Sequence, residues 1–248
     1  MRALPLLALG IAAYGAFLVA GIPAAVVAPR LAESTKGQAT LANAEGSVWS
    51  GSGTLRVVHG GTALAIDRIE WSFAPSRLFL GEIAFDLKAA SKDLSATAQA
   101  ARSVGEWRVR DLAATAPASM ADTFAPLAAA WQPGGTIAID APAFAFDGRE
   151  FKGDARASWR DAALSLSPVR PLGTWTATVK GEGQKAAVAL ATDKGPLRLA
   201  GKGTLEANGR LVFDGEARAE PGRDKDLESL LALLGPRRAD GAHALQLR

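Results

Sequence analysis

The feature that most constrains this chain is a long N-terminal stretch without charge. Between Arg2 and Arg30 every residue is uncharged, and Leu, Ala, Val and Ile dominate. A helix rises about 1.5 Å per residue and a bilayer core is about 30 Å thick, so about 20 apolar residues can span it. The sequence therefore predicts a membrane anchor over residues 1–30. Its main apolar residues are Leu6, Leu7, Leu9, Ile11, Phe17, Leu18, Val19, Ile22, Val26 and Val27.

Two other interpretations of this stretch stay open. A secretory signal peptide has an apolar region of about 7–15 residues before small residues at a cleavage site, which Ala20 and Gly21 could supply. The apolar run continues beyond them through Val26 and Val27, which favours an uncleaved helix. A buried core helix is disfavoured because the rest of the chain has the pattern of strands. The short tail before the anchor favours an N-terminus in the cytoplasm and a body outside it.

Residues 31–248 are predicted to form a β-rich domain. Ile83, Phe85 and Leu87 alternate with small or charged residues, and Trp107 and Val109 do the same. This period of two indicates strands with one apolar and one polar face. Alanine, abundant here, is a poor strand former, so the alternation decides the assignment. We expect a mainly β fold: a long curved antiparallel sheet, a meander, with one or two short helices.

Local signals place turns and irregularities in this sheet. The alternation changes phase at Asp67-Arg68, which predicts a bulge. Asn208-Gly209 between apolar residues predicts a tight hairpin. Pro142 predicts an edge strand or the start of a strand, because proline cannot donate a hydrogen bond to a neighbouring strand.

Two segments have helical spacing instead. Apolar residues within 117–131 recur at helical intervals and predict one short helix or two pieces. Residues 226–234 carry a leucine stripe and predict a second helix, capped by Asp224 or Asp226 and ended by Gly235.

The residues that carry most catalytic chemistry are absent or isolated. There is no cysteine, and the two histidines, His59 and His243, do not have the spacing of metal ligands. Ser50 lacks the preceding glycine of a nucleophile elbow, since Val48 occupies that position. The net charge of +3 is scattered along the chain, which is not the basic face of a nucleic-acid-binding protein. We expect no enzyme activity, no catalytic residues, no cofactor, no metal and no nucleic acid.

The most distinctive local string is residues 45–54, Glu-Gly-Ser-Val-Trp-Ser-Gly-Ser-Gly-Thr. Gly46 and Gly51 permit backbone conformations or close approaches that other residues resist. Trp49 between them offers a large area to bury. The string predicts a strand, a bulge and a hairpin around a buried tryptophan.

The chain resembles the type II secretion system protein N family, also called general secretion pathway protein N. The resemblance is carried by residues 45–51 after the anchor, by Pro-Leu-Gly-Thr-Trp at residues 171–175, and by Gly-Pro-Leu-Arg-Leu-Ala-Gly at residues 195–201. The last string leads into residues 211–219 and the leucine-rich helix that ends at Gly235. The order of these strings and the size of the chain also agree.

This resemblance implies an accessory, non-enzymatic inner-membrane component of the machine that exports folded proteins across the outer membrane of Gram-negative bacteria. One inner-membrane span would hold a C-terminal domain in the periplasm, where other secretion-system proteins are the expected partners. The family is also similar in architecture to the AsmA-like group, whose curved sheets present an apolar trough.

The alternative function is therefore periplasmic lipid handling or envelope maintenance. A secretion component would close its apolar face or cover it with a protein, whereas a lipid-handling protein would leave an open groove. The candidate face for a partner or lipid comprises Gly46, Trp49, Gly51, Trp71, Phe85, Trp107, Trp175 and Phe213.

Overall fold

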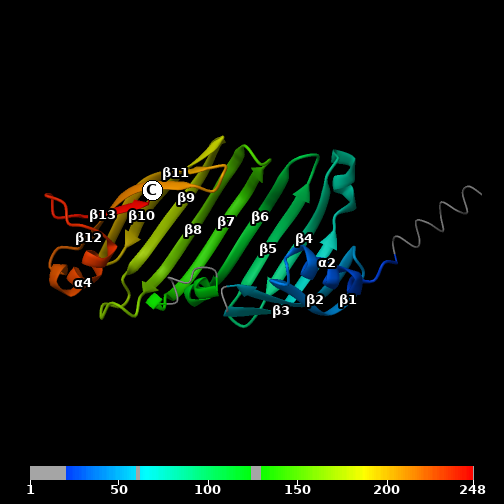
Figure 1. Ribbon diagram of the computed structural model, residues 1–248, viewed down its shortest axis with the longest axis horizontal. Coiled ribbons are helices and arrows are strands. Elements are labelled where there is room, and N and C mark those ends of the chain that lie inside the picture. Colours follow the sequence, from blue (N-terminus) through cyan, green and yellow to red (C-terminus); the bar gives the residue numbers. More distant parts are fainter. Residues whose placement is uncertain (1–20, 60–61, 124–129, 248) are drawn as a thin grey trace, which may run out of the picture.

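The computed structural model, which describes residues 21–59, 62–123 and 130–247, is organised around one antiparallel sheet (Figure 1). Thirteen strands make up this sheet in the described residues, and each pairs with the next one in the chain. This confirms the predicted antiparallel meander. The strands are β1 (Ala39–Gly46), β2 (Ser50–His59), β3 (Thr62–Phe73), β4 (Ile83–Ala90), β5 (Ser95–Arg102), β6 (Trp107–Pro117), β7 (Gly134–Phe146), β8 (Phe151–Ala163), β9 (Gly173–Gly183), β10 (Lys185–Lys194), β11 (Leu197–Glu206), β12 (Leu211–Ala219) and β13 (His243–Leu247).

Short helices precede the first strand or connect strands of the sheet. They are η1 (Ala24–Val26), α2 (Val27–Ser34), η2 (Pro75–Leu80), η3 (Ala118–Thr123) and α4 (Asp224–Leu234), of which α2 and α4 are α-helices. Helix α4 confirms the predicted leucine-rich helix, but Asp224 and Asp226 lie in its first turn and do not cap it. There their charges face the positive end of the helix dipole. Of the helix predicted within 117–131, η3 forms one piece, residues 130–131 are also helical, and residues 124–129 lie outside the described part.

Bulges bend the strands, and some could be predicted. Between β2 and β3 the register shifts where Gly53 pairs with Ile69 and Leu55 pairs with Ile66, so Asp67-Arg68 forms the predicted bulge. The hairpin at Asn208-Gly209 is also confirmed, with Leu205 paired to Leu211. Three further bulges hold non-glycine residues in the left-handed region of φ, a conformation that Asn and Asp tolerate better than most residues. These residues are Asn43, Asp111 and Asp161.

The interpretation of Pro142 was wrong. Strand β7 runs through this residue and lies between β6 and β8 in the middle of the sheet. A register shift between Asp140 and Ala143 leaves Pro142 in a bulge. A bulge is the other place where a sheet tolerates proline, because the missing N–H is not required for pairing there.

Most of the predicted anchor lies outside the described residues, since the description begins at residue 21. None of the helices in the described part is both long and apolar enough to cross a bilayer. The segment that follows residue 21 is attached to the β body: the N–H of Val48 donates to the carbonyl oxygen of Ile22 at 3.0 Å, and Pro23 forms a β-bridge with Ser47.

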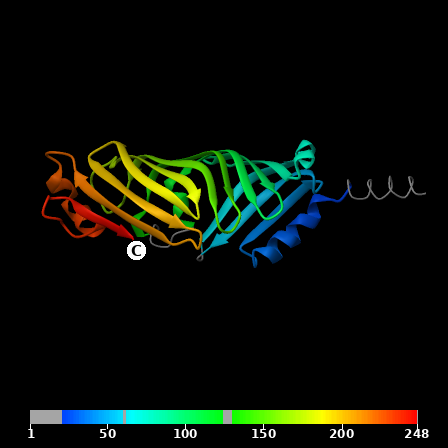
Figure 2. The same cartoon turned by 90° about the horizontal axis from the view of Figure 1, so that it is seen from above.

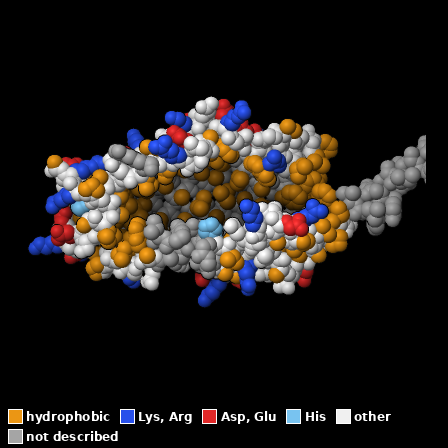
Figure 3. Space-filling model, viewed as in Figure 1, with side chains coloured by type: hydrophobic (Ala, Val, Ile, Leu, Met, Phe, Trp, Pro, Cys, Tyr) orange, Lys and Arg blue, Asp and Glu red, His pale blue; other side chains and the backbone are white. Residues whose placement is uncertain are grey.

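The sheet is curved, and one face forms a long trough. Figure 2 shows the strands curling around the long axis, with α2 at one end of the sheet and α4 at the other. Figure 3 shows that the hollowed face is lined by hydrophobic side chains and that charged side chains gather on the rims. Strand alternation explains this division, because each strand sends every second side chain to the trough.

Candidate functional site

Cross-strand rows of apolar side chains build the surface of the trough. One row joins Phe73, Phe85, Ala100, Val109 and Phe144 across β3 to β7. The rings of Phe73 and Phe85 lie 5.4 Å apart between centroids, a separation at which aromatic pairs attract. The strongest hydrophobic side chains of this half therefore share one face.

The middle of the trough is lined mainly by small side chains. A second row joins Ala89, Ala96, Ala114, Ile139 and Ala157 across β4 to β8. An alanine methyl group covers the backbone without filling the space above it. The alanine content of the chain thus gives this part of the sheet a low apolar floor, and Figure 3 shows a hollow on this face.

At the N-terminal end the trough holds a cavity of about 350 Å³. Trp71 and Phe85, both predicted face residues, line it together with Val27 and Leu31 of α2. Val27 belongs to the stretch that the sequence assigns to the anchor. The complete lining is Val27, Leu31, Leu41, Val48, Leu55, Ile69, Trp71, Phe85, Leu87 and Ala100, all apolar.

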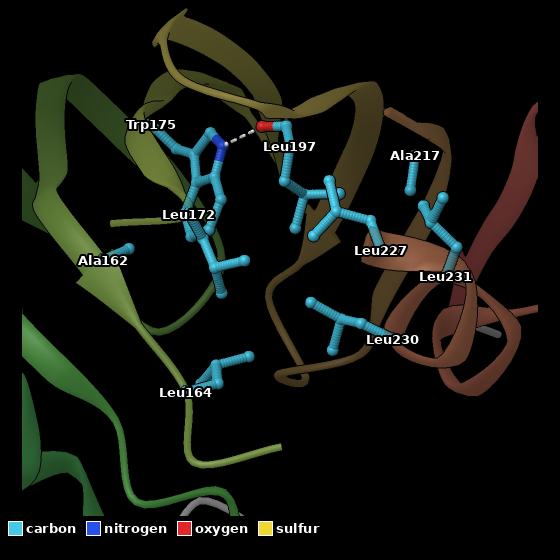
Figure 4. Packing of buried hydrophobic residues seen from close by; sticks show 9 residues of the cluster. All are labelled: Ala162, Leu164, Leu172, Trp175, Leu197, Ala217, Leu227, Leu230 and Leu231. Carbon is cyan, nitrogen blue, oxygen red and sulfur yellow. Dashed lines mark hydrogen bonds between the residues drawn. The ribbon is translucent and has the colours of Figure 1, made fainter. Parts of the chain in front are cut away.

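At the C-terminal end helix α4 closes the trough. Leu227, Leu230 and Leu231 of this helix pack in one buried cluster with Leu172 and Trp175 of the sheet end (Figure 4). The indole N–H of Trp175 donates to the carbonyl oxygen of Leu197 at 3.0 Å. Trp175 is thus part of a closed core.

Phe213 is also covered. Its ring lies over glycines of β11 and β12: a Cβ atom at Gly201 would lie 2.4 Å from its Cζ atom. Trp175 and Phe213 therefore differ from Trp71 and Phe85, although all four belong to the predicted face.

The string around Trp49 forms the turn between β1 and β2. Gly46 pairs with Gly51, and Gly51 pairs in turn with Trp71 of β3. The Trp71 indole N–H donates to the carbonyl oxygens of Ser47 and Val48, at 3.2 and 3.1 Å. A Cβ atom at Gly51 would lie 2.6 Å from Trp71 Cζ2, so the glycine makes room for the ring.

Gly46 and Gly209 offer a matched test of this turn. Both have φ of +86°, but a Cβ atom at Gly46 would lie 2.5 Å from the carbonyl oxygen of Ser50, whereas one at Gly209 meets nothing within 4 Å. Gly209→Ala is expected to cost about 1 kcal/mol from φ alone, and Gly46→Ala about 2–3 kcal/mol because overlap adds to it. Urea unfolding of the full chain in mild detergent measures both. Equal costs would contradict the described packing of the turn.

Trp49 is half-buried, less than the sequence predicts, because it lies in the turn and not within a strand. Its ring packs 5.1 Å from that of Phe73. Truncating a fully buried tryptophan costs about 3–5 kcal/mol, so we expect about 2 kcal/mol for Trp49→Ala. The loss is measured as a shift of the urea midpoint, and no shift would mean that the indole stabilises nothing in the isolated protein.

Trp107 is at the start of the interior strand β6, at the rim formed by the strand ends, and is exposed. The guanidinium of Arg102 lies 4.4 Å from the centre of its ring, a cation–π contact. On the opposite face of the same rim, Arg108 and Arg110 both bind the carboxylate of Glu82, which is buried. Hydrogen bonds from Arg110 lower the pKa of Glu82 against the opposing effect of burial, and the charges of Arg110 and Arg108 add to the lowering.

No group of three or more histidine or acidic side chains in the described part of the chain could hold a metal ion. The trough offers an apolar surface with polar side chains along its rims, an arrangement that suits binding of an apolar ligand or protein surface. The part of the lining that α2 contributes was not predicted from the sequence. The available signal was the spacing of four residues between Val27 and Leu31, which places both on one face of a short amphipathic helix.

Comparison with known families gives one match. The family model described as type II secretion system, protein N, matches residues 37–246. This range covers β1 to β12 and all of β13 but its last residue. No curated protein and no solved structure gave a match.

Proposed function

We propose that this chain, which belongs to the type II secretion system protein N family, is a non-enzymatic accessory component of that system. Its trough would receive an apolar surface of another secretion-system protein. The observation that carries this proposal is the open apolar face between α2 and α4, combined with the family match. Binding a partner that removes an apolar surface of this extent from water lowers the free energy of the system.

The placement in the envelope is part of the proposal. The uncharged stretch over residues 3–29 would span the inner membrane once and leave the β body in the periplasm. Alkaline washing of membranes tests this. Retention in the pellet supports an uncleaved anchor, whereas release into the wash would favour a cleaved signal peptide.

Photocrosslinking in the native bacterium tests the function of the trough. A photoreactive residue would replace Phe85 or Leu87, which line the cavity, and Asp86 or Lys88 as matched controls on the outer face of the same strand. We expect adducts to secretion-system proteins from Phe85 and Leu87 only. Adducts of equal yield from all four positions would contradict a specific role of the trough.

A second candidate function rests on the cavity itself. Its lining of ten apolar residues is suited to acyl chains, as in the lipid-handling alternative of the AsmA-like type. Adducts from Phe85 and Leu87 to phospholipid and not to protein would favour this function. Trp175 provides a further reference, because its place in the closed core predicts no adduct to either.

A further inference from the structure

A group of apolar side chains protrudes beyond the ends of strands β4, β5 and β6, at the rim of the trough. We call this group the apolar lip; it consists of Leu78, Phe79, Leu80, Ile83, Val104 and Trp107. The side chains of Phe79 and Val104 are almost fully in contact with solvent, with relative exposures of 93% and 103%. Single exposed hydrophobic residues are common, but a contiguous group of this kind marks an interaction surface.

Strand pairing brings the members of the lip together. Ile83 at the start of β4 pairs with Arg102 at the end of β5, and Arg102 pairs with Trp107 at the start of β6. Val104 is in the turn between β5 and β6, and η2 leads directly into β4. Ile83 and Trp107 are on the trough face of their strands, so the apolar surface of the trough continues to the lip.

The lip is held in place by ordered contacts. The carboxylate of Glu82, two residues after the end of η2, binds Arg108 and Arg110 of β6. The backbone N–H of Glu82 also donates to the carbonyl oxygen of Arg77 at 3.1 Å. The exposure of Phe79 therefore belongs to a fixed conformation of η2.

The charges around the lip have a positive surplus. Residues 75–86 and 101–110 contain four arginines, Arg77, Arg102, Arg108 and Arg110, against three acidic residues, Glu82, Asp86 and Glu106. Both glutamates are engaged by Arg108, at this rim, in ion pairs. The guanidinium of Arg102 lies over the Trp107 ring, so a positive charge is in contact with the apolar lip.

The opposite end of the same hairpin has no such character. The turn between β4 and β5 carries Lys92 and Asp93, both exposed, and its one large apolar residue, Leu94, is half-buried. These strands therefore carry the apolar lip at one end and not at the other. The lip is near the end of the sheet where α2 joins the body, as both views of the ribbon show (Figures 1 and 2).

We propose that the apolar lip inserts into the surface of an anionic phospholipid bilayer. Phe79, Trp107 and the aliphatic members would enter the boundary between head groups and acyl chains, where aromatic rings are favoured. Arg77 and Arg102 would remain at the level of the phosphates and bind them. A protruding apolar tip with a basic base fits a bilayer better than it fits a protein partner, which would need a complementary acidic pocket. This inference does not depend on the secretion role.

Site-specific fluorescence tests the proposal in the full chain. The chain contains no cysteine, so Phe79→Cys, Val104→Cys and the control Asp93→Cys each give one labelling site for an environment-sensitive fluorophore. Each labelled protein is reconstituted into vesicles of phosphatidylethanolamine and phosphatidylglycerol. We expect a blue-shifted emission at positions 79 and 104 and at least twofold stronger quenching by nitroxide-labelled lipid than at position 93. Equal quenching at the three positions would overturn the proposal.

Charge variants separate a bilayer from a protein partner. In the labelled Phe79→Cys protein, Arg77→Glu with Arg102→Glu is expected to weaken the quenching, and vesicles of phosphatidylcholine alone are expected to do the same. Unchanged circular dichroism shows that the variant is folded. The proposal fails if the label at position 79 shows no lipid quenching in vesicles and a crosslinker at the same position captures a protein in native membranes. The lip would then be a protein interface.

Discussion

Replacing Leu227 with alanine is expected to lower the free energy of unfolding by about 3–4 kcal/mol. Leu227 has no solvent-exposed surface and is in the cluster that joins α4 to the sheet, beside Leu172 and Leu197. Removing three carbons from such a site costs the transfer energy of the lost groups and leaves a cavity, about 2–5 kcal/mol in total. Because α4 covers the C-terminal end of the trough, the loss is expected to loosen this end first.

Leu233→Ala on the same helix is the control. Leu233 is 66% exposed, so its truncation should change stability by no more than about 0.5 kcal/mol. Urea unfolding of the full chain in mild detergent, followed by tryptophan fluorescence, compares the two variants with the unchanged protein. Similar midpoints for Leu227→Ala and Leu233→Ala would show that α4 does not pack as described.

The architecture of the sheet could be predicted because its signals are local. Alternation within a strand reports which side chains share a face, and it identified β4 around Phe85 correctly. A change of phase reported the bulge at Asp67-Arg68, and Asn208-Gly209 reported a turn. Each of these signals is complete within a few residues.

Coverage of the apolar face could not be predicted in the same way. Phe85 and Trp175 have similar alternation, yet one lines an open cavity and the other is buried under α4. The difference arises from a helix that follows Trp175 by three strands, and local periodicity contains no information about which element packs over a strand. The family resemblance did not supply it either, because it concerned strings and their order.

Pro142 shows a second limit. Its missing N–H restricts it to an edge strand, the start of a strand or a bulge, and the sequence alone favoured the first two. The bulge at β7 also depends on the paired strands, which carry Asp111 in a left-handed conformation on one side and Gly153 on the other. Only the register of three neighbouring strands decides among these places.

The ion-pair group of Glu82, Arg108 and Arg110 was also missed, although it positions η2 and with it the apolar lip. Arg110 donates to both carboxylate oxygens of Glu82, at 3.0 and 2.9 Å, and Arg108 binds the same group. Glu82 is only 4% exposed. Alternation predicted charged side chains on the outer face, but their pairing joins residues far apart in sequence and appears only once β4 and β6 are placed in the sheet.

Glu82→Gln is therefore expected to destabilise the protein by about 3 kcal/mol at neutral pH, because the partly buried guanidinium of Arg110 loses its counter-charge and that of Arg108 keeps only Glu106. The pKa of Glu82 is lowered in the folded state, chiefly by the hydrogen bonds from Arg110. The unfolded chain takes up the proton first as pH falls, so the stabilisation is complete above the ordinary carboxyl value of about 4.3 and is lost as pH falls through the folded pKa.

The difference in urea midpoint between Glu82→Gln and the unchanged protein should therefore be large at pH 7 and shrink below about pH 4. Glu70→Gln is the control: Glu70 pairs with Arg68 at 2.6 Å on the exposed surface, where water screens the pair, so its loss should shift the urea midpoint little. A Glu82→Gln effect that is as small as that of Glu70→Gln, or that persists unchanged at pH 3, would contradict a buried and charged Glu82. Loss of the pair should also release η2, so Glu82→Gln is expected to make position 79 more mobile without removing the apolar side chains of the lip.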